Sequence, residues 1–164
     1  MSRSQTLLPE FDHEVAGTRR VLERVPTDKF SWLPHDKSMS FGKLATHVAN
    51  LPMLASMALQ KDELNVVERR ANPPKADTTE ELLALFDQAA AEARATIAGA
   101  SDELLFQKFT LRNGDQVIFS VPKIAALRTF FMNHLIHHRG QLTVYLRLNG
   151  IPVPGLYGPS ADEG

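Results

Sequence analysis

A long amphipathic segment near the end of the chain carries two histidines on its apolar side. His134 and His138 are four residues apart, and this spacing places both side chains on one face of a helix. The same stripe contains Leu127, Phe131, Leu142 and Tyr145. Such a face is expected to point into the protein interior. Because a buried imidazole needs a polar partner, and one metal ion can bind two imidazoles, the pair constrains both the packing of this helix and its chemistry.

Three further segments repeat apolar residues at helical spacing. The first covers residues 7–25 and is expected to end near Pro26. The second begins after Ser40, a typical N-cap residue, and carries His47 on its apolar stripe. Pro52 lies within this segment and removes one internal hydrogen bond, so we expect a kink about one turn beyond His47.

The third helical segment follows a stretch, residues 62–77, that is expected to form a loop. Thr78 or Thr79 is the expected N-cap, because an acidic first turn follows directly. The helix is expected to stop at Gly99.

A hairpin is predicted between the third and the last helix. Residues 109–119 alternate in polarity around Asn113-Gly114, the strongest short hairpin pattern. Ser120 as N-cap and Pro122 in the first turn are then expected to open the last helix, which continues to Asn149-Gly150.

Four amphipathic helices can bury their apolar stripes only against one another. The predicted fold class is therefore all-α, a helical bundle with a small hairpin-like excursion before its last helix. A chain of 164 residues with 43% hydrophobic content suits one domain over residues 1–164. The Pro/Gly-rich end over residues 151–164 is expected to be extended.

Charge and hydropathy exclude several classes of partner. The formal net charge is −1, and basic residues are interleaved with acidic ones, so neither nucleic acid nor an anionic membrane is an expected partner. No apolar stretch approaches transmembrane length, and the first residues lead into an amphipathic pattern rather than a secretion signal. A cytoplasmic protein is the expectation.

The chain has no cysteine, so histidines are the main candidates for transition-metal ligands. Any transition-metal site must be built from His with Asp, Glu or water. His47, His134 and His138 all lie on apolar stripes, and one divalent ion binds three imidazoles while leaving a position for water or substrate. A structural histidine that is hydrogen-bonded to a carbonyl or carboxylate is the competing explanation, and it stays open for each of the three.

The remaining histidines are weaker candidates. His137 lies at the edge of the apolar stripe, which makes it the less suitable ligand of its helix. His13 lies off the stripe of the first helix, and His35 lies in a polar loop. Both are expected to be solvated.

Three other features have ordinary structural explanations. Trp32 is expected to pack over one end of the bundle, and the Arg69-Arg70 pair to lie in a solvated loop. Tyr145 could donate a hydrogen bond near a metal, but a core tyrosine with its hydroxyl satisfied elsewhere is the more frequent case.

The chain resembles the DinB family of small metal-binding helical bundles. The resemblance is carried by residues 30–40, 44–50 and 133–142, and the closing segment 147–163 is also similar to the family's ending. The family's histidine pattern is matched at each position, by His47 on the second helix and by the pair His134 and His138, with three residues between them, on the last.

This resemblance implies a four-helix bundle in up-down-down-up order, a divalent metal such as zinc, nickel or manganese at the three histidines, and frequent homodimers. Related members include thiol-dependent transferases and isomerases. The leading hypothesis is a metal-dependent enzyme that activates a low-molecular-weight thiol, or water, towards a small-molecule substrate. A non-enzymatic metal-binding bundle with a structural or stress-related dimerisation role is the alternative. The sequence assigns no general base.

Overall fold

The computed structural model describes residues 2–71 and 73–163. Met1, Asn72 and Gly164, together with the side chain of Arg70, lie outside the described residues. The expectations of a loop at Asn72, an extended end at Gly164 and a solvated Arg70 side chain therefore stay predictions.

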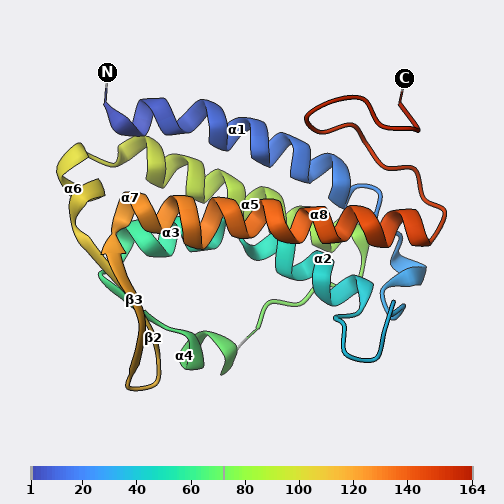
Figure 1. The fold of residues 1–164 in the computed structure, drawn as a ribbon, viewed down its shortest axis with the longest axis horizontal. Coiled ribbons are helices and arrows are strands. Elements are labelled where there is room, and N and C mark those ends of the chain that lie inside the picture. Colours follow the sequence, from blue (N-terminus) through green and yellow to red (C-terminus); the bar gives the residue numbers. More distant parts are fainter. Residues whose placement is uncertain (1, 72, 164) are drawn as a thin grey trace.

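Helices make up most of the described chain (Figure 1). They are α1 (Arg3–Leu22), η1 (Thr27–Lys29), α2 (Phe41–Asn50), α3 (Met53–Gln60), α4 (Val66–Ala71), α5 (Thr79–Gly99), α6 (Asp102–Phe106), α7 (Lys123–Ala126), the π-helix η2 (Leu127–Met132) and α8 (Asn133–Leu148). The strands are β1 (Glu63–Asn65), β2 (Lys108–Asn113) and β3 (Gln116–Pro122). None of the helices in residues 2–71 and 73–163 is both long and apolar enough to cross a membrane.

The predicted helix boundaries are largely confirmed. The Ser40 hydroxyl caps α2 by accepting a hydrogen bond from the Lys43 N–H at 3.3 Å. The expected kink at Pro52 is present as an interruption between α2 and α3. Thr78 caps α5, which ends at Gly99 as expected.

Two expectations about boundaries are wrong. Ser120 does not cap the last helix: it lies in β3, where its hydroxyl shares a 3.0 Å hydrogen bond with that of Thr110, and the helix begins at Lys123. Residues 62–77 are not a continuous loop, because they contain β1 and α4. The second error comes from the pairing of β1 with β2, which lies far from it in the sequence and is not reported by local patterns. The first error arises because the predicted hairpin extends beyond residue 119, to Pro122.

The chain is mostly helical, but the all-α prediction is corrected by a small sheet. The predicted hairpin is present as β2 and β3, which pair antiparallel, and β1 pairs with β2 in parallel, aligning Leu64 with Leu111. The turn is formed by Gly114 and Asp115, and Gly114 has a φ of 60°, a left-handed value that glycine adopts without strain. The hairpin thus pairs with a third strand and forms part of a three-stranded sheet.

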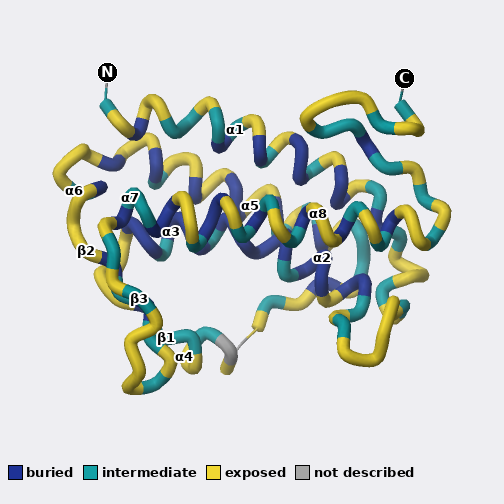
Figure 2. The backbone as a smooth tube through the Cα atoms, in the orientation of Figure 1, coloured by how far each residue is buried: buried dark blue, intermediate teal, exposed yellow. Residues whose placement is uncertain are grey.

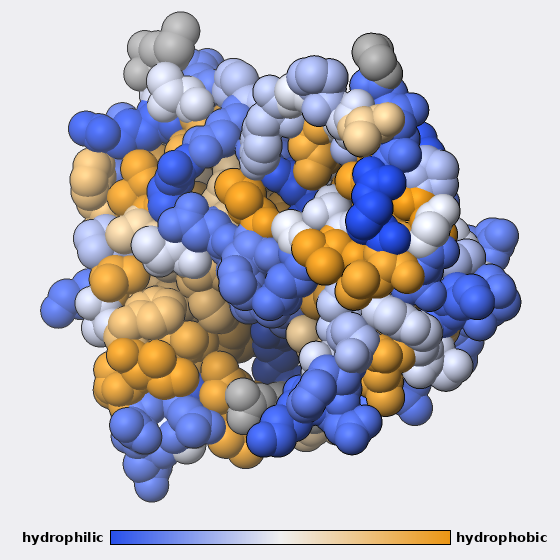
Figure 3. Space-filling model, turned by 45° about the vertical axis from the view of Figure 1, so that its right-hand side comes forward, coloured by the Kyte–Doolittle hydropathy of each residue, from blue (hydrophilic) through white to orange (hydrophobic). Residues whose placement is uncertain are grey.

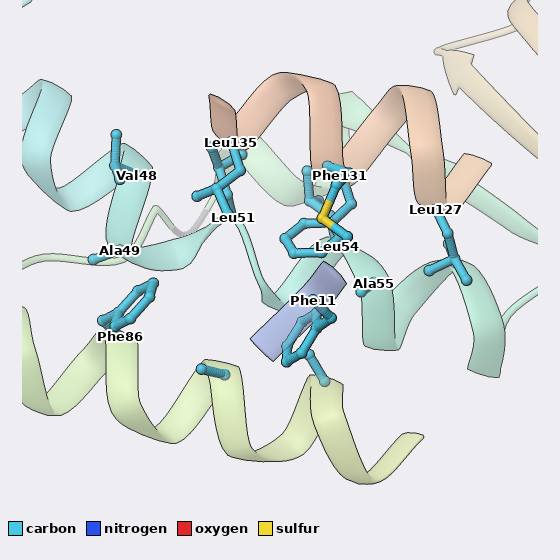
Figure 4. Packing of buried hydrophobic residues seen from close by; sticks show 14 of the residues in the cluster. Phe11, Val48, Ala49, Leu51, Leu54, Ala55, Phe86, Leu127, Phe131 and Leu135 are labelled. Atoms are coloured by element: carbon cyan, nitrogen blue, oxygen red, sulfur yellow. The ribbon is translucent and has the colours of Figure 1, made fainter. Parts of the chain in front are cut away.

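The core lies between the long helices. Helix α1 packs against α5 and α8, and the α2–α3 pair packs against α5 and the last helix (Figure 1). Buried residues line the inward sides of these helices (Figure 2). Phe11 of α1, Leu54 of α3 and Phe131 of η2 meet at the centre (Figure 4), where the rings of Phe11 and Phe131 lie 5.8 Å apart. This packing sets the position of α2 relative to α8.

The end of the chain folds back over the first helix. Residues 151–163 form no helix, which agrees with the expectation of an extended end, and an isolated bridge joins Ser160 and Glu163. The segment is tied to α8 by the ion pair of Arg147 with Asp162, at 2.6 Å. It is tied to α1 by Tyr157, whose hydroxyl donates to the Glu14 carboxylate.

Candidate metal centre

One face of α2 presents polar side chains, because residues three or four apart in a helix share a face. Lys43, His47 and Asn50 lie on this face and line a pocket. Leu44 and Val48, on the other side of the helix, are buried in the core. The division of α2 into an apolar and a polar face therefore orients His47 towards the pocket.

The other two histidines come from α8, which packs against α2. His134 and His138 are one turn apart and line the same pocket, while Leu135 and Leu142 of α8 are buried. The sequence placed both histidines inside the core. The structure places them instead at the edge of the core, half-buried and facing the pocket.

The three imidazoles form one cluster. His47 Nε2 lies 3.2 Å from His134 Nε2. The ring centroid of His138 lies 4.5 Å from that of His47 and 4.7 Å from that of His134. One ring nitrogen of each histidine lies within 4.8 Å of the corresponding nitrogens of the other two. Such a cluster can hold a metal ion.

The nitrogen separation fits shared coordination. At metal–nitrogen distances of about 2.1 Å, two imidazole nitrogens lie about 3.4 Å apart in a tetrahedral site and about 3.0 Å apart in an octahedral one, and the observed 3.2 Å falls between these values. A hydrogen bond between two neutral imidazoles also gives this distance, but it does not involve Nε2 of His138. A single ion accounts for all three.

One histidine is oriented through a hydrogen bond outside the cluster. His138 Nδ1 donates to Gln141 Oε1 at 2.7 Å, which leaves Nε2 of His138 available as a ligand. Fixing the ring orientation in this way is typical of metal-binding histidines. Sequence analysis missed Gln141, although its position three residues after His138 places it on the same helical face.

The surroundings of the cluster lower the pKa values of its three imidazoles. Burial, followed by the positive charges of neighbouring histidines and Arg69, lowers the pKa of His47 to about 4. Burial and His138 lower the pKa of His134 to about 4, against the opposing effect of the Phe130 backbone. Burial also lowers the pKa of His138. The imidazoles are therefore neutral near pH 7, the state in which they bind metals.

The other histidines lie outside the cluster, as predicted. His137 is exposed on α8, although its ring contacts that of His138 at 4.8 Å. His13 is exposed and stacks on Tyr157, and His35 is exposed and accepts a hydrogen bond from the Lys37 N–H at 3.1 Å.

Two aromatic predictions are also confirmed. The Tyr145 hydroxyl donates to the Met39 carbonyl at 3.1 Å, so this tyrosine has an ordinary structural partner. Trp32 packs edge-on against Tyr145 and Phe41, with ring centroids 5.4 and 6.0 Å apart, respectively. These contacts close one end of the helical assembly next to the pocket.

The histidine cluster opens into a large pocket of about 990 Å³. The pocket lies between α2, α8, α4 and the segment that leads into α5. Apolar side chains, among them Phe30, Val66 and Phe130, share its walls with charged ones. Figure 3 shows this side of the molecule hollowed, with hydrophobic residues on one side of the opening and hydrophilic residues on the other. The volume is sufficient for a small-molecule ligand.

Arg69 is a pocket residue that sequence analysis assigned to a solvated loop. It lies in α4, is half-buried and lines the pocket together with the histidines. Burial lowers the pKa of its guanidinium. No local pattern could have identified it, because the short helix α4 is held in place by the sheet.

The sheet positions α4 through Asn65, the last residue of β1. Its side-chain oxygen accepts hydrogen bonds from the N–H of Gly114 in the hairpin turn and from the N–H of Val67 in α4, each at 3.1 Å. The start of α4 is thereby attached to the hairpin. As a result, the hairpin determines where Arg69 lies relative to the histidines.

The chain is similar to known proteins both over its whole length and over one short stretch. The family model of the DinB family matches residues 1–164. A 38-residue stretch is 50% identical to "Uncharacterized protein YrdA" of Bacillus subtilis (strain 168), and the match spans 23% of this chain and 23% of the length of that protein.

Solved structures show the same fold at low sequence identity. A DinB-like protein from Bacillus cereus ATCC 10987 aligns with a TM-score of 0.70 and 22% identity, over 92% of this chain and 95% of that chain. The DinB-like protein YjoA from Bacillus subtilis aligns with a TM-score of 0.69 and 22% identity, over 96% of this chain and 98% of that chain. Together with a family match that extends over every residue, the shared fold leads to the conclusion that the chain belongs to the DinB family.

Proposed function

We propose that the protein is a metal-dependent enzyme in which His47, His134 and His138 hold a divalent ion: zinc, nickel or manganese. The observation that carries this proposal is the convergence of three half-buried imidazoles from two helices at the wall of a large pocket. Within residues 2–71 and 73–163, no Asp or Glu joins the cluster as a further ligand. A site with three protein ligands that opens into a pocket is typical of catalytic rather than structural metal centres.

The reaction proposed first is transfer of a low-molecular-weight thiol to an electrophilic small molecule. The bound ion would lower the pKa of the thiol and so supply the nucleophile that a chain without cysteine lacks. The three neutral imidazoles leave the charge of the ion uncompensated. The chain's contribution is to orient the ring nitrogens, through Gln141 for His138, and to hold the reactants in a pocket lined by apolar and charged side chains. Hydrolysis by activated water is the second choice for the same site.

A non-enzymatic role in dimerisation is the competing proposal, and one observation favours it. Val144 and Leu148 are one turn apart on α8 and are 55% and 61% exposed, respectively. A pair of exposed aliphatic residues on one helical face suits a contact with a second copy of the chain. A homodimer and a cytoplasmic location are part of both proposals, and so is the up-down-down-up order of a four-helix bundle.

Metal analysis followed by cobalt substitution tests the enzyme proposal. The full chain, purified without an affinity tag, should contain about one divalent ion per chain. In the cobalt-substituted protein, adding a thiol such as glutathione should produce a sulfur-to-cobalt charge-transfer band, and a chromogenic electrophile should be conjugated. A band without conjugation limits the role to thiol binding. Absence of both would move the assignment to hydrolysis, and a closed site with a fourth protein ligand would favour the structural role.

A further inference from the structure

The charged residues of the pocket favour an anionic ligand. Lys43, Arg69 and Lys75 line the pocket, whereas Asp77 is the one carboxylate among its described lining residues. A divalent ion on three neutral imidazoles would add further positive charge. Since a cleft lined by one sign of charge attracts ligands of the opposite sign, the pocket suits a ligand that carries negative charge.

Arg69 is the charged side chain of the pocket with the strongest need for a partner. It is half-buried, whereas Lys43 and Lys75 are exposed. No Asp or Glu in the described parts of the chain lies within ion-pair distance of it. Exposed arginines elsewhere do have such partners, as Arg94 has in Asp12 at 2.8 Å. A guanidinium removed from water without a carboxylate is costly, and a bound anion would remove that cost.

A second observation points to a ligand in the same pocket. Asn50 lines the pocket and is 3% exposed, and its side-chain oxygen has no hydrogen-bond partner among the described residues. Buried side-chain oxygens in native proteins almost always have a partner. A donor group on a bound molecule would satisfy this one. Asn50 lies three residues after His47 on α2, so the ligand would contact both the histidine cluster and this amide.

We propose that Arg69 is a specificity-determining residue that binds a carboxylate of the substrate. This inference rests on the proposed function and narrows it: the cosubstrate is a thiol that also carries a carboxylate. Its sulfur faces the histidine cluster, and its carboxylate accepts two parallel hydrogen bonds from the guanidinium. Arginine is the residue best suited to this planar, bidentate geometry.

The hairpin also contributes to this specificity. Asn65 connects the hairpin turn to the start of α4, and pairing of β1 with β2 fixes Asn65 in turn. Residues that hold Arg69 at a set distance from the histidines also set the length of substrate that can bind both. The sheet is therefore a specificity element, although it contributes no residue to the histidine cluster.

A matched pair of probes tests this role. 3-Mercaptopropionate and 3-mercaptopropionamide have the same size, but only the first carries a charge. The dissociation constant of each is measured on the cobalt-loaded full chain from the charge-transfer band. The ion attracts the carboxylate in every variant, so the readout is the change in the ratio of the two constants. A charged hydrogen bond predicts that Arg69→Gln lowers the preference for the acid about tenfold or more. Arg69→Lys keeps the positive charge but cannot donate two parallel hydrogen bonds, so it should lower the preference for the acid by less.

Arg20→Gln is the matched control, because Arg20 is exposed on α1, lies outside the pocket lining and makes the same change in net charge. It should leave the preference unchanged. An unchanged preference in Arg69→Gln would overturn the proposal. An equal loss of affinity for both probes, accompanied by a lower melting temperature or lower metal content, would show a structural role and overturn it as well.

A second pair of probes separates this inference from the proposed function. Succinate and its half-amide succinamate contain no sulfur, and their binding to the zinc-loaded full chain is measured by calorimetry. If no thiol gives a band but Arg69→Gln abolishes the preference for succinate, thiol chemistry is wrong and the carboxylate site stands. If thiols give a band but neither preference depends on Arg69, the carboxylate site is wrong and thiol binding stands.

Discussion

Arg139 and Glu14 form an ion pair inside the protein. Arg139 Nη2 lies 2.6 Å from Glu14 Oε2, and the two side chains are only 2% and 7% exposed, respectively. Arg139 also donates to the Glu14 backbone carbonyl and to the Thr18 hydroxyl. Because Arg139 directly follows His138, pairing with α1 on one side of α8 helps to orient His138 towards α2 on another side. The ion pair between α1 and α8 thus helps to fix the orientation of a residue in the candidate metal centre.

Breaking this pair should destabilise the protein strongly. Glu14→Gln leaves the buried Arg139 charge without a counter-charge, and we expect a loss of about 3–5 kcal/mol in the free energy of unfolding. Asp12→Asn is the matched control, because Asp12 lies two residues away on α1 and pairs with Arg94 at the surface. Its effect should be much smaller. Urea unfolding of both variants measures the difference, and equal effects would contradict the assigned role of the buried pair.

The second prediction concerns metal binding by the three clustered histidines. His47→Ala, His134→Ala and His138→Ala should each abolish stoichiometric metal binding, because each removes one of three ligands. His137→Ala should preserve it, since His137 is exposed and lies outside the cluster. Metal content per chain, measured after dialysis, is the readout. Full occupancy in His47→Ala would refute the three-histidine site.

Gln141 should tune metal affinity without being a ligand. Gln141→Ala removes the 2.7 Å hydrogen bond that orients the His138 ring. Losing such a bond typically costs about 10–100-fold in metal affinity. Competition with a chromophoric chelator measures this change. Thr143→Ala is a suitable control, because its hydroxyl donates to the Gly140 carbonyl on the same helix and takes no part in the cluster. Equal affinities in the two variants would argue against the orienting role.

The stability of the metal-free protein should depend on pH in a defined interval. Burial lowers the pKa of His47 and His134 to about 4 in the folded protein, whereas the unperturbed value is about 6.5. Between these values the unfolded chain binds more protons than the folded chain, so stability rises with pH. The full contribution is present above about pH 6.5 and is lost as the pH falls towards 4. His47→Gln should make this decline shallower in urea titrations at several pH values.

The same depressed pKa values set the acid limit of metal binding. Because His47 and His134 stay neutral to about pH 4 in the folded protein and the pKa of His138 is also lowered, added metal should still raise the melting temperature at pH 6 and should lose this effect near pH 4. Thermal scans with and without excess metal at both pH values provide the test. Loss of the metal effect already at pH 6 would mean that the imidazoles titrate like exposed ones.

Lys123 should stabilise the junction between the sheet and the helices. Its ammonium group is buried and donates to the carbonyls of Leu59 and Lys61, at 3.1 and 2.8 Å. Lys123→Met leaves both acceptors without this donor, and we expect a loss of about 1.5–3 kcal/mol or more in the free energy of unfolding. Lys123 also pairs with Asp62, but Asp62 is 83% exposed. Asp62→Asn should therefore have little effect, and a large one would contradict this account.

Helix positions and the histidine set could be predicted because they depend on nearby residues. The cap at Ser40, the break at Pro52 and the end of α5 at Gly99 each follow from backbone chemistry within a few residues. The four-residue spacing of His134 and His138 places them on one face whatever the rest of the fold does. His47 was grouped with them on the expectation that it lies on an apolar stripe, whereas the structure places it on the polar face of α2, which lines the pocket.

Other features of the last helix could not be predicted in this way. The wide helical turn η2 precedes His134, and neither its position nor the start of the helix at Lys123 follows from local propensity. A π-helical turn adds a residue to the helix and changes the direction of the side chains that follow. Phe131, which lies within this turn, packs against Phe11, which belongs to a segment 120 residues away, so the surroundings of the turn depend on tertiary contacts.

The sequence by itself determined where the long helices lie, which histidines of the last helix share a face, and that a metal site here must use nitrogen ligands, because these properties depend on spacing and composition. Only the tertiary structure decided that the histidines line a pocket rather than a closed core, and that Arg69 joins them there. The physical reason is that α4 is too short to be stable alone. It forms where Asn65 and the pairing of β1 with β2 hold it, and those contacts join residues that lie almost 50 positions apart, such as Asn65 and Gly114.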